Sequence, residues 1–260
     1  MKLQMKISLA MATGLAITGS AQAGFTTVVA PTAAGEIGHA AIFDGVYGGS
    51  FSASGLNFTN GSITATRIHD FDSGGGHSGS LNLLASSDVG ANDQVWHDGI
   101  ANLQAVARYA GYSQDFGYYQ GSDNPGTGFT SGTLLSLVTN PFLGEGPTSS
   151  PTNIVGDWRW GRDGTTTNSS LHSDNVDGLD HMVTYMITGA GLAALGYDAD
   201  ATIWMIFFDD QEWPDTDRDF NDLAVEIVAR AIPIPAPVML AGLGLLGLGL
   251  SRRRLAASIS

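Results

Sequence analysis

Carboxylates are concentrated in one stretch of the sequence, residues 209–222. Alternate residues of a tightly curled loop can direct their oxygens at one point, and oxygen donors are the ligands that calcium prefers. A divalent cation would also relieve the mutual repulsion of closely packed carboxylates. The spacing therefore predicts a calcium site. Its candidate ligands are Asp210, Asp215, Asp217, Asp219 and Asp222.

This stretch does not match the helix–loop–helix calcium motif. Phe220 stands where that motif requires glycine for its sharp turn, and both flanks predict strands instead of helices. Two interpretations stay open. One is a calcium site in a turn between strands. The other is a solvated acidic turn in which Arg218 pairs locally and Asp219 or Asn221 caps turn amides.

The two segments that must position this turn have strand-like sequences. Residues 202–208 are bulky on both faces, with Ile203, Met205 and Phe207 on one side. Such a pattern predicts a central strand that is buried on both sides. Residues 223–229 predict the strand that follows the turn.

The remainder of the chain between the two termini predicts an all-β protein. Turn-forming residues recur at intervals of roughly eight to twelve residues, which is typical of short strands in a sandwich or barrel. We expect an antiparallel β-sandwich that is jelly-roll-like. Further strands are expected at 25–30, 41–47, 62–68, 80–85, 133–139 and 181–188, a short helix at 102–110, and a long loop at 144–168.

The charge of the central body, residues 24–231, is strongly negative. It contains six arginines, no lysine and all 25 acidic residues of the chain, which gives a formal charge of −19. Nucleic acids and anionic lipids require basic surfaces, so neither is an expected partner. The chain has no cysteine, which excludes disulfides and thiol chemistry.

The N-terminus has the pattern of a secretory signal peptide. Lys2 and Lys6 precede an apolar run at 7–17, and a small-residue cleavage site ends at Ala23. We expect cleavage there, so that Gly24 becomes the first residue of an exported chain.

The C-terminus carries a proline-rich motif, an apolar segment and a basic cluster, in that order. The apolar segment, 238–250, would extend about 20 Å as a helix, against about 30 Å for a bilayer core, so flanking residues must help it to span. The arginines should stay cytoplasmic, which leaves the body outside. The motif residues are Ile232, Pro233, Ile234, Pro235 and Ala236, and the basic residues are Arg252, Arg253 and Arg254.

This C-terminal order resembles the PEP-CTERM sorting signal of exported bacterial proteins, and most closely its Val-Pro-Leu-Pro-Ala variant (VPLPA-CTERM). The resemblance covers residues 232–254, with isoleucine at the valine and leucine positions. It implies a Gram-negative bacterium in which an exosortase of the inner membrane processes the chain. It also implies a cell-envelope or extracellular-matrix location and an association with biofilm or exopolysaccharide.

A second resemblance covers about residues 170–230. The run from Asp217 to Asp222, Asp-Arg-Asp-Phe-Asn-Asp, and the acidic end of the preceding strand are similar to an uncharacterised domain family of exported bacterial proteins. The resemblance implies a β-rich module of surface or matrix proteins that has no established catalysis.

Other combinations of residues carry weaker signals. His69, Asp70, Asp72 and His77 lack the convergent spacing of a transition-metal site and favour a polar turn. The pairs His97–Asp98 and Asp180–His181 could supply half of a catalytic group, but adjacent strand residues point to opposite faces.

Aromatic side chains suggest sugar binding as an alternative to a structural or adhesive function. If exposed, Trp158 and Trp160, which flank Arg159, and Tyr118 and Tyr119, near Asp115, could stack on sugars. Such residues more often belong to a core or form cross-strand pairs. A secreted hydrolase would need two carboxylates in one cleft, and no pair is distinguished by its spacing.

We therefore expect an exported structural or adhesive protein with calcium as its cofactor, and no enzyme. A carbohydrate-binding module associated with exopolysaccharide and a secreted hydrolase are the two alternatives. The expected organisation is a signal peptide at 1–23, a β-rich part at 24–143, a loop or joint at 144–168, an acidic β-rich module at 169–231, a sorting signal at 232–254 and a tail at 255–260.

Overall fold

The structure is a computed structural model that describes residues 25–70, 80–84, 91–110, 113–121, 133–137, 141–164, 166–212 and 214–229. The expected signal peptide, the sorting motif from Ile232 to Ala236, the apolar segment at 238–250 and the arginines at 252–254 lie outside the described residues, as do Asp72 and His77. No helix in the described part of the chain is long and apolar enough to cross a bilayer.

Strands dominate the described residues. In chain order the elements are α1 (His39–Tyr47), β1 (Ser52–Ser54), β2 (Asn57–Thr59), β3 (Thr64–Arg67), β4 (Ser80–Asn82), β5 (Asn92–Arg108), β6 (Gln114–Gln120), β7 (Thr133–Leu137), β8 (Phe142–Leu143), β9 (Thr148–Asp163), β10 (Thr167–Ser169), the 3₁₀ helix η2 (His172–Asp174), β11 (Met182–Thr188), the 3₁₀ helix η3 (Ala190–Leu195), β12 (Thr202–Phe208) and β13 (Leu223–Ala229).

All these strands belong to one sheet, which has 13 strands within the described residues. Its main order is β1-β2-β3-β11-β12-β13-β5-β9-β6-β7, with β10 on β9 and both β4 and β8 on β5. Every pairing is antiparallel except that of β4 with β5. The prediction of a mostly β, antiparallel protein is confirmed.

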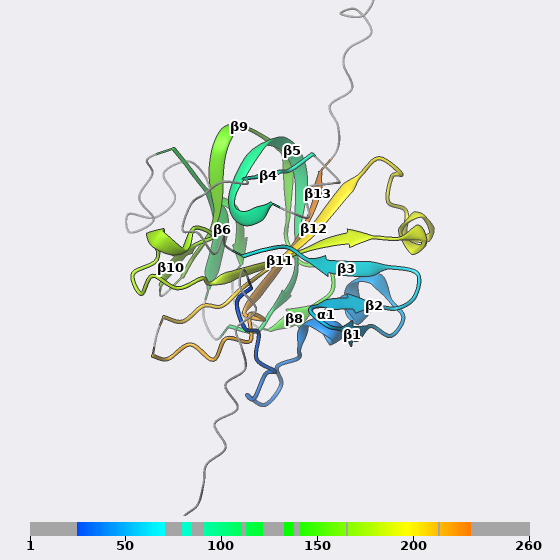
Figure 1. Ribbon diagram of the computed structural model, residues 1–260, viewed down its shortest axis with the longest axis horizontal. Helices are drawn as coiled ribbons and strands as arrows, with labels where there is room; N and C mark the ends of the chain where they lie inside the picture. Colours follow the sequence, from blue (N-terminus) through cyan, green and yellow to red (C-terminus); the bar gives the residue numbers. More distant parts are fainter. Residues whose placement is uncertain are drawn as a thin grey trace, which may run out of the picture.

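The sheet bends back on itself through its two longest strands, β5 and β9, which arch over one side of the molecule (Figure 1). Their pairing shifts register between His97 and Gly99 and again between Ala101 and Leu103. Such bulges bend strands and increase their twist. The bend brings β6, β7 and β9 to face β11, β12 and β13 across one hydrophobic core, whose largest members are Trp96, Trp158, Trp160 and Trp204.

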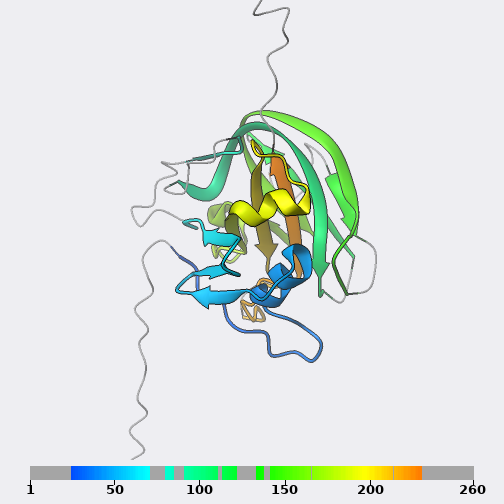
Figure 2. The same cartoon turned by 90° about the vertical axis from the view of Figure 1, so that its right-hand side faces the viewer.

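A second core lies on the opposite face of the central strands. Helix α1 covers this face near the hairpin β1–β2 (Figure 2). Strand β12 contributes to both cores, because Trp204, Ile206 and Phe208 enter the first, and Ile203, Met205 and Phe207 enter the second. All seven of its residues are buried, which confirms the prediction of a central strand buried on both sides.

The strands at 62–68, 80–85, 133–139, 181–188, 202–208 and 223–229 are confirmed as β3, β4, β7, β11, β12 and β13 where the structure describes them. Two other expected strands are wrong. Residues 25–30 form no regular strand. Residues 41–47 belong to helix α1, whose buried positions His39, Ile42, Phe43 and Tyr47 have helical spacing.

The helix and the loop expected in the middle of the chain are also wrong. Residues 102–110 lie mostly in β5, where Leu103 and Ala105 face one core while Val106 and Ala107 face the other. The expected loop at 144–168 contains β9 and most of its residues pair with β5 or β6. The sheet joins strands from the expected N-terminal part, 24–143, to strands from the expected acidic module, 169–231. Strand β3 lies beside β11, and β5 lies beside β13.

A substitution at Phe207 tests whether packing around β12 stabilises the fold. Its buried ring packs against His39, Phe43 and Tyr185, with centroids 4.0, 5.6 and 5.7 Å away. We expect Phe207→Ala to lower the free energy of unfolding by about 3–5 kcal/mol, because it leaves a cavity in a closely packed core. Val155→Ala, at a position that is 66% exposed in β9, should change it by less than about 0.5 kcal/mol. Urea titration of both variants measures the difference, and equal effects would contradict this role of β12.

Candidate metal centre

The acidic turn, residues 209–222, connects β12 to β13, two neighbouring strands of the sheet. Asp209, Asp210 and Asp219 are almost completely buried, and Asp222 is 8% exposed. Asp215 and Asp217 are exposed. The turn therefore combines buried and exposed carboxylates directly after β12, whose seven residues are all buried.

Two groups of three carboxylates in this region have oxygens close enough to share an ion. The first is Glu36, Asp217 and Asp219, and the second is Asp209, Asp217 and Asp222. Within each group one oxygen of every residue lies within 4.8 Å of the others. Calcium–oxygen distances are about 2.4 Å, so two ligands of one ion are at most about 4.8 Å apart. We call these five residues the carboxylate cluster, and Asp217 belongs to both of its halves.

Three of the five predicted ligands, Asp217, Asp219 and Asp222, are in the carboxylate cluster, and two are not. Asp215 is exposed on the turn, outside both groups. Asp210 also lies outside both groups, and its Oδ2 accepts a hydrogen bond of 3.2 Å from Gln114 Nε2. Sequence reasoning missed Glu36 completely. It is the only charged residue between positions 7 and 43, but nothing in the sequence connects it with the turn.

The backbone of the turn adopts an unusual conformation. Arg218 and Phe220 have positive φ values of 59° and 54°. A left-handed conformation costs a non-glycine residue about 1–2 kcal/mol, so surrounding contacts must maintain it. Phe220 is buried in the second core, which supplies such contacts. Phe220 thus adopts a backbone conformation that calcium loops usually assign to glycine, although the flanking elements are strands.

Hydrogen bonds within the turn hold the carboxylates in place. Asp209 accepts bonds from the backbone N–H of Gln211 and Arg218, at 3.1 Å each, and from the Thr216 hydroxyl. Asp219 accepts bonds from Asn221 N at 3.2 Å and Asn221 Nδ2 at 2.9 Å.

Asp222 Oδ2 accepts a bond of 2.9 Å from Asp210 N. Together with the bonds above, this contact orients the carboxylates of the turn.

The N-terminal segment, residues 25–38, packs against the same turn. Val29 N donates a hydrogen bond of 2.8 Å to Arg218 O, and Asn221 Nδ2 donates one of 3.2 Å to Ile37 O. These contacts place Glu36 beside Asp219. The carboxylate cluster therefore unites two parts of the chain that are about 180 residues apart.

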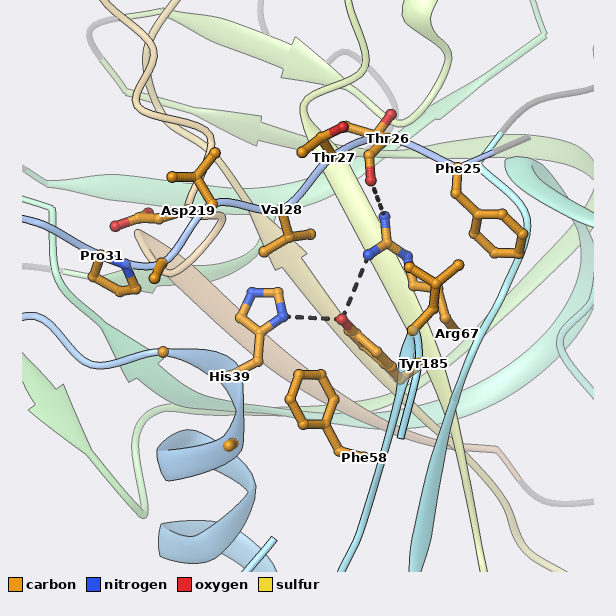
Figure 3. Close-up of a pocket in the computed structure, with 16 residues that line it drawn as sticks. Phe25, Thr26, Thr27, Val28, Pro31, His39, Phe58, Arg67, Tyr185 and Asp219 are labelled. Atoms are coloured by element: carbon orange, nitrogen blue, oxygen red, sulfur yellow. Dashed lines mark hydrogen bonds between the residues drawn. The ribbon is translucent and has the colours of Figure 1, made fainter. Parts of the chain in front are cut away.

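A cavity of about 540 Å³ lies beneath the N-terminal segment, next to Asp219 (Figure 3). At its floor, Arg67 Nη1 donates to the Tyr185 hydroxyl at 3.4 Å, and that hydroxyl lies 3.1 Å from His39 Nδ1. His39 Nε2 lies 3.3 Å from Phe220 O. A carbonyl oxygen can only accept, so Nε2 donates to it and Nδ1 accepts from Tyr185. Burial, and then the charge of Arg67, lower the pKa of His39 to about 3, which keeps the imidazole neutral.

Two carboxyl groups of the carboxylate cluster have raised pKa values. Burial and then the charge of Asp217 raise the pKa of Asp219 to about 7, with a further contribution from Glu36. Burial and then the charge of Asp210 raise the pKa of Asp222 to about 9. Carboxylates repel one another here, and a bound cation would reverse both effects.

Of the two adjacent His–Asp pairs that the sequence offered, one forms in the structure and the other does not. His97 lies 3.1 Å from Asp98 and 2.8 Å from Asp157, because a bulge with a positive φ of 35° at Asp98 brings adjacent side chains together. The argument that adjacent strand residues diverge is therefore wrong at this position. His181, in contrast, pairs with Asp177 at 3.0 Å and not with Asp180.

The turn proposed around His69 is not a simple polar turn. Asp70 is completely buried and forms an ion pair of 2.8 Å with Arg67.

The tryptophans considered for sugar stacking are also buried. Trp158 and Trp160 are each 1% exposed and pack edge to face at 4.4 Å. Tyr119 is also completely buried, whereas Tyr118 is partly exposed, so the sugar-stacking hypothesis loses three of its four side chains.

Comparison with protein-family models gives no match, and no curated protein matches the chain. Among solved structures, the C-terminal domain of the BC2L-C lectin from Burkholderia cenocepacia is similar, with a TM-score of 0.31 and 12% identity. The match covers 53% of this chain and 95% of the lectin domain. A similarity of this size establishes neither a common fold nor a common function.

The raised pKa values predict how pH changes the stability of the metal-free protein. Asp219 and Asp222 hold protons in the folded chain up to about pH 7 and 9, but only to about pH 4 in the unfolded chain. The folded state therefore binds more protons, and the free energy of unfolding falls as pH rises from about 4 to 9.

Asp222→Asn should make the free energy of unfolding fall less steeply at the upper end of this pH range. The amide keeps an oxygen that accepts from Asp210 N, but it does not ionise. Asp215→Asn, at an exposed position outside the carboxylate cluster, should retain the wild-type slope. Urea unfolding in a chelator across this pH range measures the slopes, and a wild-type slope in Asp222→Asn would be inconsistent with the raised pKa.

Proposed function

We propose that this chain is an exported structural or adhesive protein of the cell envelope or extracellular matrix, stabilised by calcium at the carboxylate cluster. The observation that carries the calcium part is the convergence of Glu36, Asp209, Asp217, Asp219 and Asp222 into two groups that share one residue. All donors are carboxylate oxygens, which favour hard cations such as calcium over zinc or copper.

Calcium would fasten the N-terminal segment to the β12–β13 turn. Glu36 belongs to that segment, whereas the other four ligands belong to the turn. An ion bound to both would add a strong contact to the hydrogen bonds at Val29 and Asn221. Binding energy would then appear as stability of the fold, which is the role expected of a structural cation in a chain that has no disulfide.

The bent sheet also supports the prediction of a jelly-roll-like β-sandwich. Its two arms face each other across the tryptophan-rich core, as the layers of a jelly-roll-like sandwich do. Export, exosortase processing and attachment to exopolysaccharide rest on the sequence patterns at the two termini.

Calcium should raise the melting temperature of the body, residues 24–231, which contains every strand that the structure describes. At a hundredfold excess over the dissociation constant, a ligand of the folded state adds about 2.7 kcal/mol. For a domain of this size that corresponds to roughly 5–10 °C. Thermal unfolding in a chelator and in excess calcium measures the rise.

Asp217→Asn is the informative variant, because it removes one ligand from both halves of the carboxylate cluster. We expect it to abolish most of the calcium-dependent rise. Asp215→Asn removes the same charge two residues away and should preserve the rise. If the two variants respond alike, or if wild-type protein melts at one temperature in both solutions, the carboxylates are a solvated surface.

The sorting motif predicts processing in the native bacterium. Replacing Pro233 and Pro235 by alanine should leave the chain at its unprocessed mass in the membrane fraction, because the exosortase would no longer recognise it. Pro214→Ala, in the exposed part of the acidic turn, is the matched control and should be processed normally. Mass spectrometry of the membrane and released fractions distinguishes these outcomes. Normal processing of the double variant would exclude this motif as the signal.

A further inference from the structure

Glu226 is an acidic residue in the middle of β13 that lies outside the carboxylate cluster. Its neighbours Val225 and Ile227 enter the first core, so Glu226 points to the opposite face, where helix α1 lies (Figure 2). The residue is only 6% exposed. Its Oε1 accepts hydrogen bonds from the hydroxyls of Tyr47, at 2.8 Å, and Tyr197, at 2.6 Å.

The second oxygen of Glu226, Oε2, accepts no hydrogen bond from any described residue. It is also not among the completely buried side-chain atoms of the described residues that lack a partner, so solvent reaches it. Glu226 thus has one oxygen that is held by the protein and one that remains for a ligand.

Two cavities open beside Glu226, and this residue lines both. Their volumes are about 290 and 250 Å³. Gln104 in β5, which is opposite Glu226 in the pairing of β5 with β13, also lines both cavities. The cavities therefore meet at this pair, and we call them together the β5–β13 groove. The other polar side chains that line it belong to Asn102, Glu145, Thr148, Ser149 and Tyr197.

The walls of the β5–β13 groove are held by contacts within the fold. Gly146 N donates to Ala105 O, and Ala105 N donates to Pro147 O, at 2.9 Å each. Glycine permits this close approach, because a Cβ at Gly146 would lie 2.5 Å from Ala105 O. The two tyrosines that bond to Glu226 connect the other wall to β13. A groove that exists before the ligand binds loses little free energy in becoming ordered.

Uncharged side chains that both donate and accept hydrogen bonds predominate in the groove. Asn102 and Gln104 are partly exposed, and their side-chain amides bond to no described residue. Each amide offers an oxygen and an NH₂ group, and the hydroxyls of Thr148 and Ser149 can also do both. Oε2 of Glu226 adds an acceptor. A hydroxyl-rich molecule matches this set, because each of its hydroxyls donates and accepts as well.

Other classes of ligand match the groove less well. The described lining residues include no arginine, lysine or histidine, so an anion would have no cationic partner. An amine would find the carboxylates of Glu145 and Glu226, but it would leave the NH₂ groups of the two amides unpaired. An apolar molecule would bury all these polar groups without partners, which costs free energy. Glu145 and Glu226 are also absent from the groups of described carboxylates that could share a metal ion.

We propose that the β5–β13 groove binds a short stretch of neutral carbohydrate through Oε2 of Glu226 and the amides of Asn102 and Gln104. The ring of Tyr197, which lines the smaller cavity, would pack against the C–H face of a sugar ring. This binding function goes beyond the calcium-stabilised structural role. It does not depend on that role, because no member of the carboxylate cluster lines the groove.

An array of neutral, amine-bearing and anionic glycans tests the class of ligand. The full-length chain is applied in a detergent that contains no sugar, since a glycoside headgroup would compete. We expect binding to neutral glycans and little binding to the other two classes. If the wild-type chain binds no neutral glycan, or binds only amine-bearing or anionic ones, the proposal is overturned.

Gln104→Ala tests the location of the site. The side chain of Gln104 belongs to neither core, so the substitution removes an amide from the groove and leaves the packing intact. Isothermal titration calorimetry with the strongest neutral glycan should show a dissociation constant about ten times higher than that of wild type. Gln211→Ala, at an exposed glutamine outside the groove, is the matched control and should bind as wild type does.

Glu226→Gln is the second variant. Its amide oxygen can still accept from Tyr47 and Tyr197, but an NH₂ group replaces the acceptor Oε2. We expect this variant also to weaken binding by about tenfold. Equal affinities of Gln104→Ala, Glu226→Gln and Gln211→Ala would place the glycan elsewhere and overturn the proposal.

The glycan array uses wild-type protein, so a misfolded variant does not affect its result. Asp217→Asn, which tests the calcium proposal, should bind the glycan as wild type does. A wild-type chain that melts at a higher temperature in calcium but binds no neutral glycan would overturn this inference alone.

Discussion

Burial of carboxylates in a chain with few positive side chains is the constraint that shapes this structure. A buried ionised carboxylate must be paired, hydrogen-bonded or protonated. The body has six arginines for its 25 acidic residues, so arginine can satisfy only part of this need. Arg67 pairs with Asp70. Glu226 instead accepts bonds from the hydroxyls of Tyr47 and Tyr197, at 2.8 and 2.6 Å, and burial raises its pKa.

An excess of negative charge remains after these contacts at the carboxylate cluster. The cluster lies beside the N-terminal segment, which bonds to the turn through Val29 and to Asp70 and Asp180 through Thr26. Hydrogen bonds to the turn and to two aspartates therefore hold a segment that has little regular structure. The proposed calcium ion would supply the carboxylate cluster with positive charge from the surroundings.

The hydrophobic framework makes this charge distribution possible. Strand β12 is buried on both faces, and its antiparallel pairing with β13 fixes both ends of the acidic turn. Phe220 anchors the middle of the turn in the second core despite its positive φ. His39 bonds to the carbonyl of the same residue, which connects helix α1 with the turn. Packing energy can thus hold carboxylates together that would otherwise move apart.

Sequence reasoning succeeded where the signal was local. Strand β12 was predicted with its two buried faces because side chains alternate with a period of two along any strand. It failed at 102–110, where Leu103 and Val106 have a helix-like spacing, because pairing with β9 and β13 outweighs that weak preference. It also failed at 144–168, where polar residues conceal a long strand whose Trp158 and Trp160 enter the core.

The sequence by itself determined the mostly β character, the negative charge and the presence of a carboxylate-dense turn, because these depend on composition and on neighbours along the chain. Only the tertiary structure decided which carboxylates meet. It brought Glu36 to Asp217 and left Asp215 outside the carboxylate cluster. Such encounters depend on how distant segments pack together, and the spacing of residues along one strand or turn contains no information about that packing.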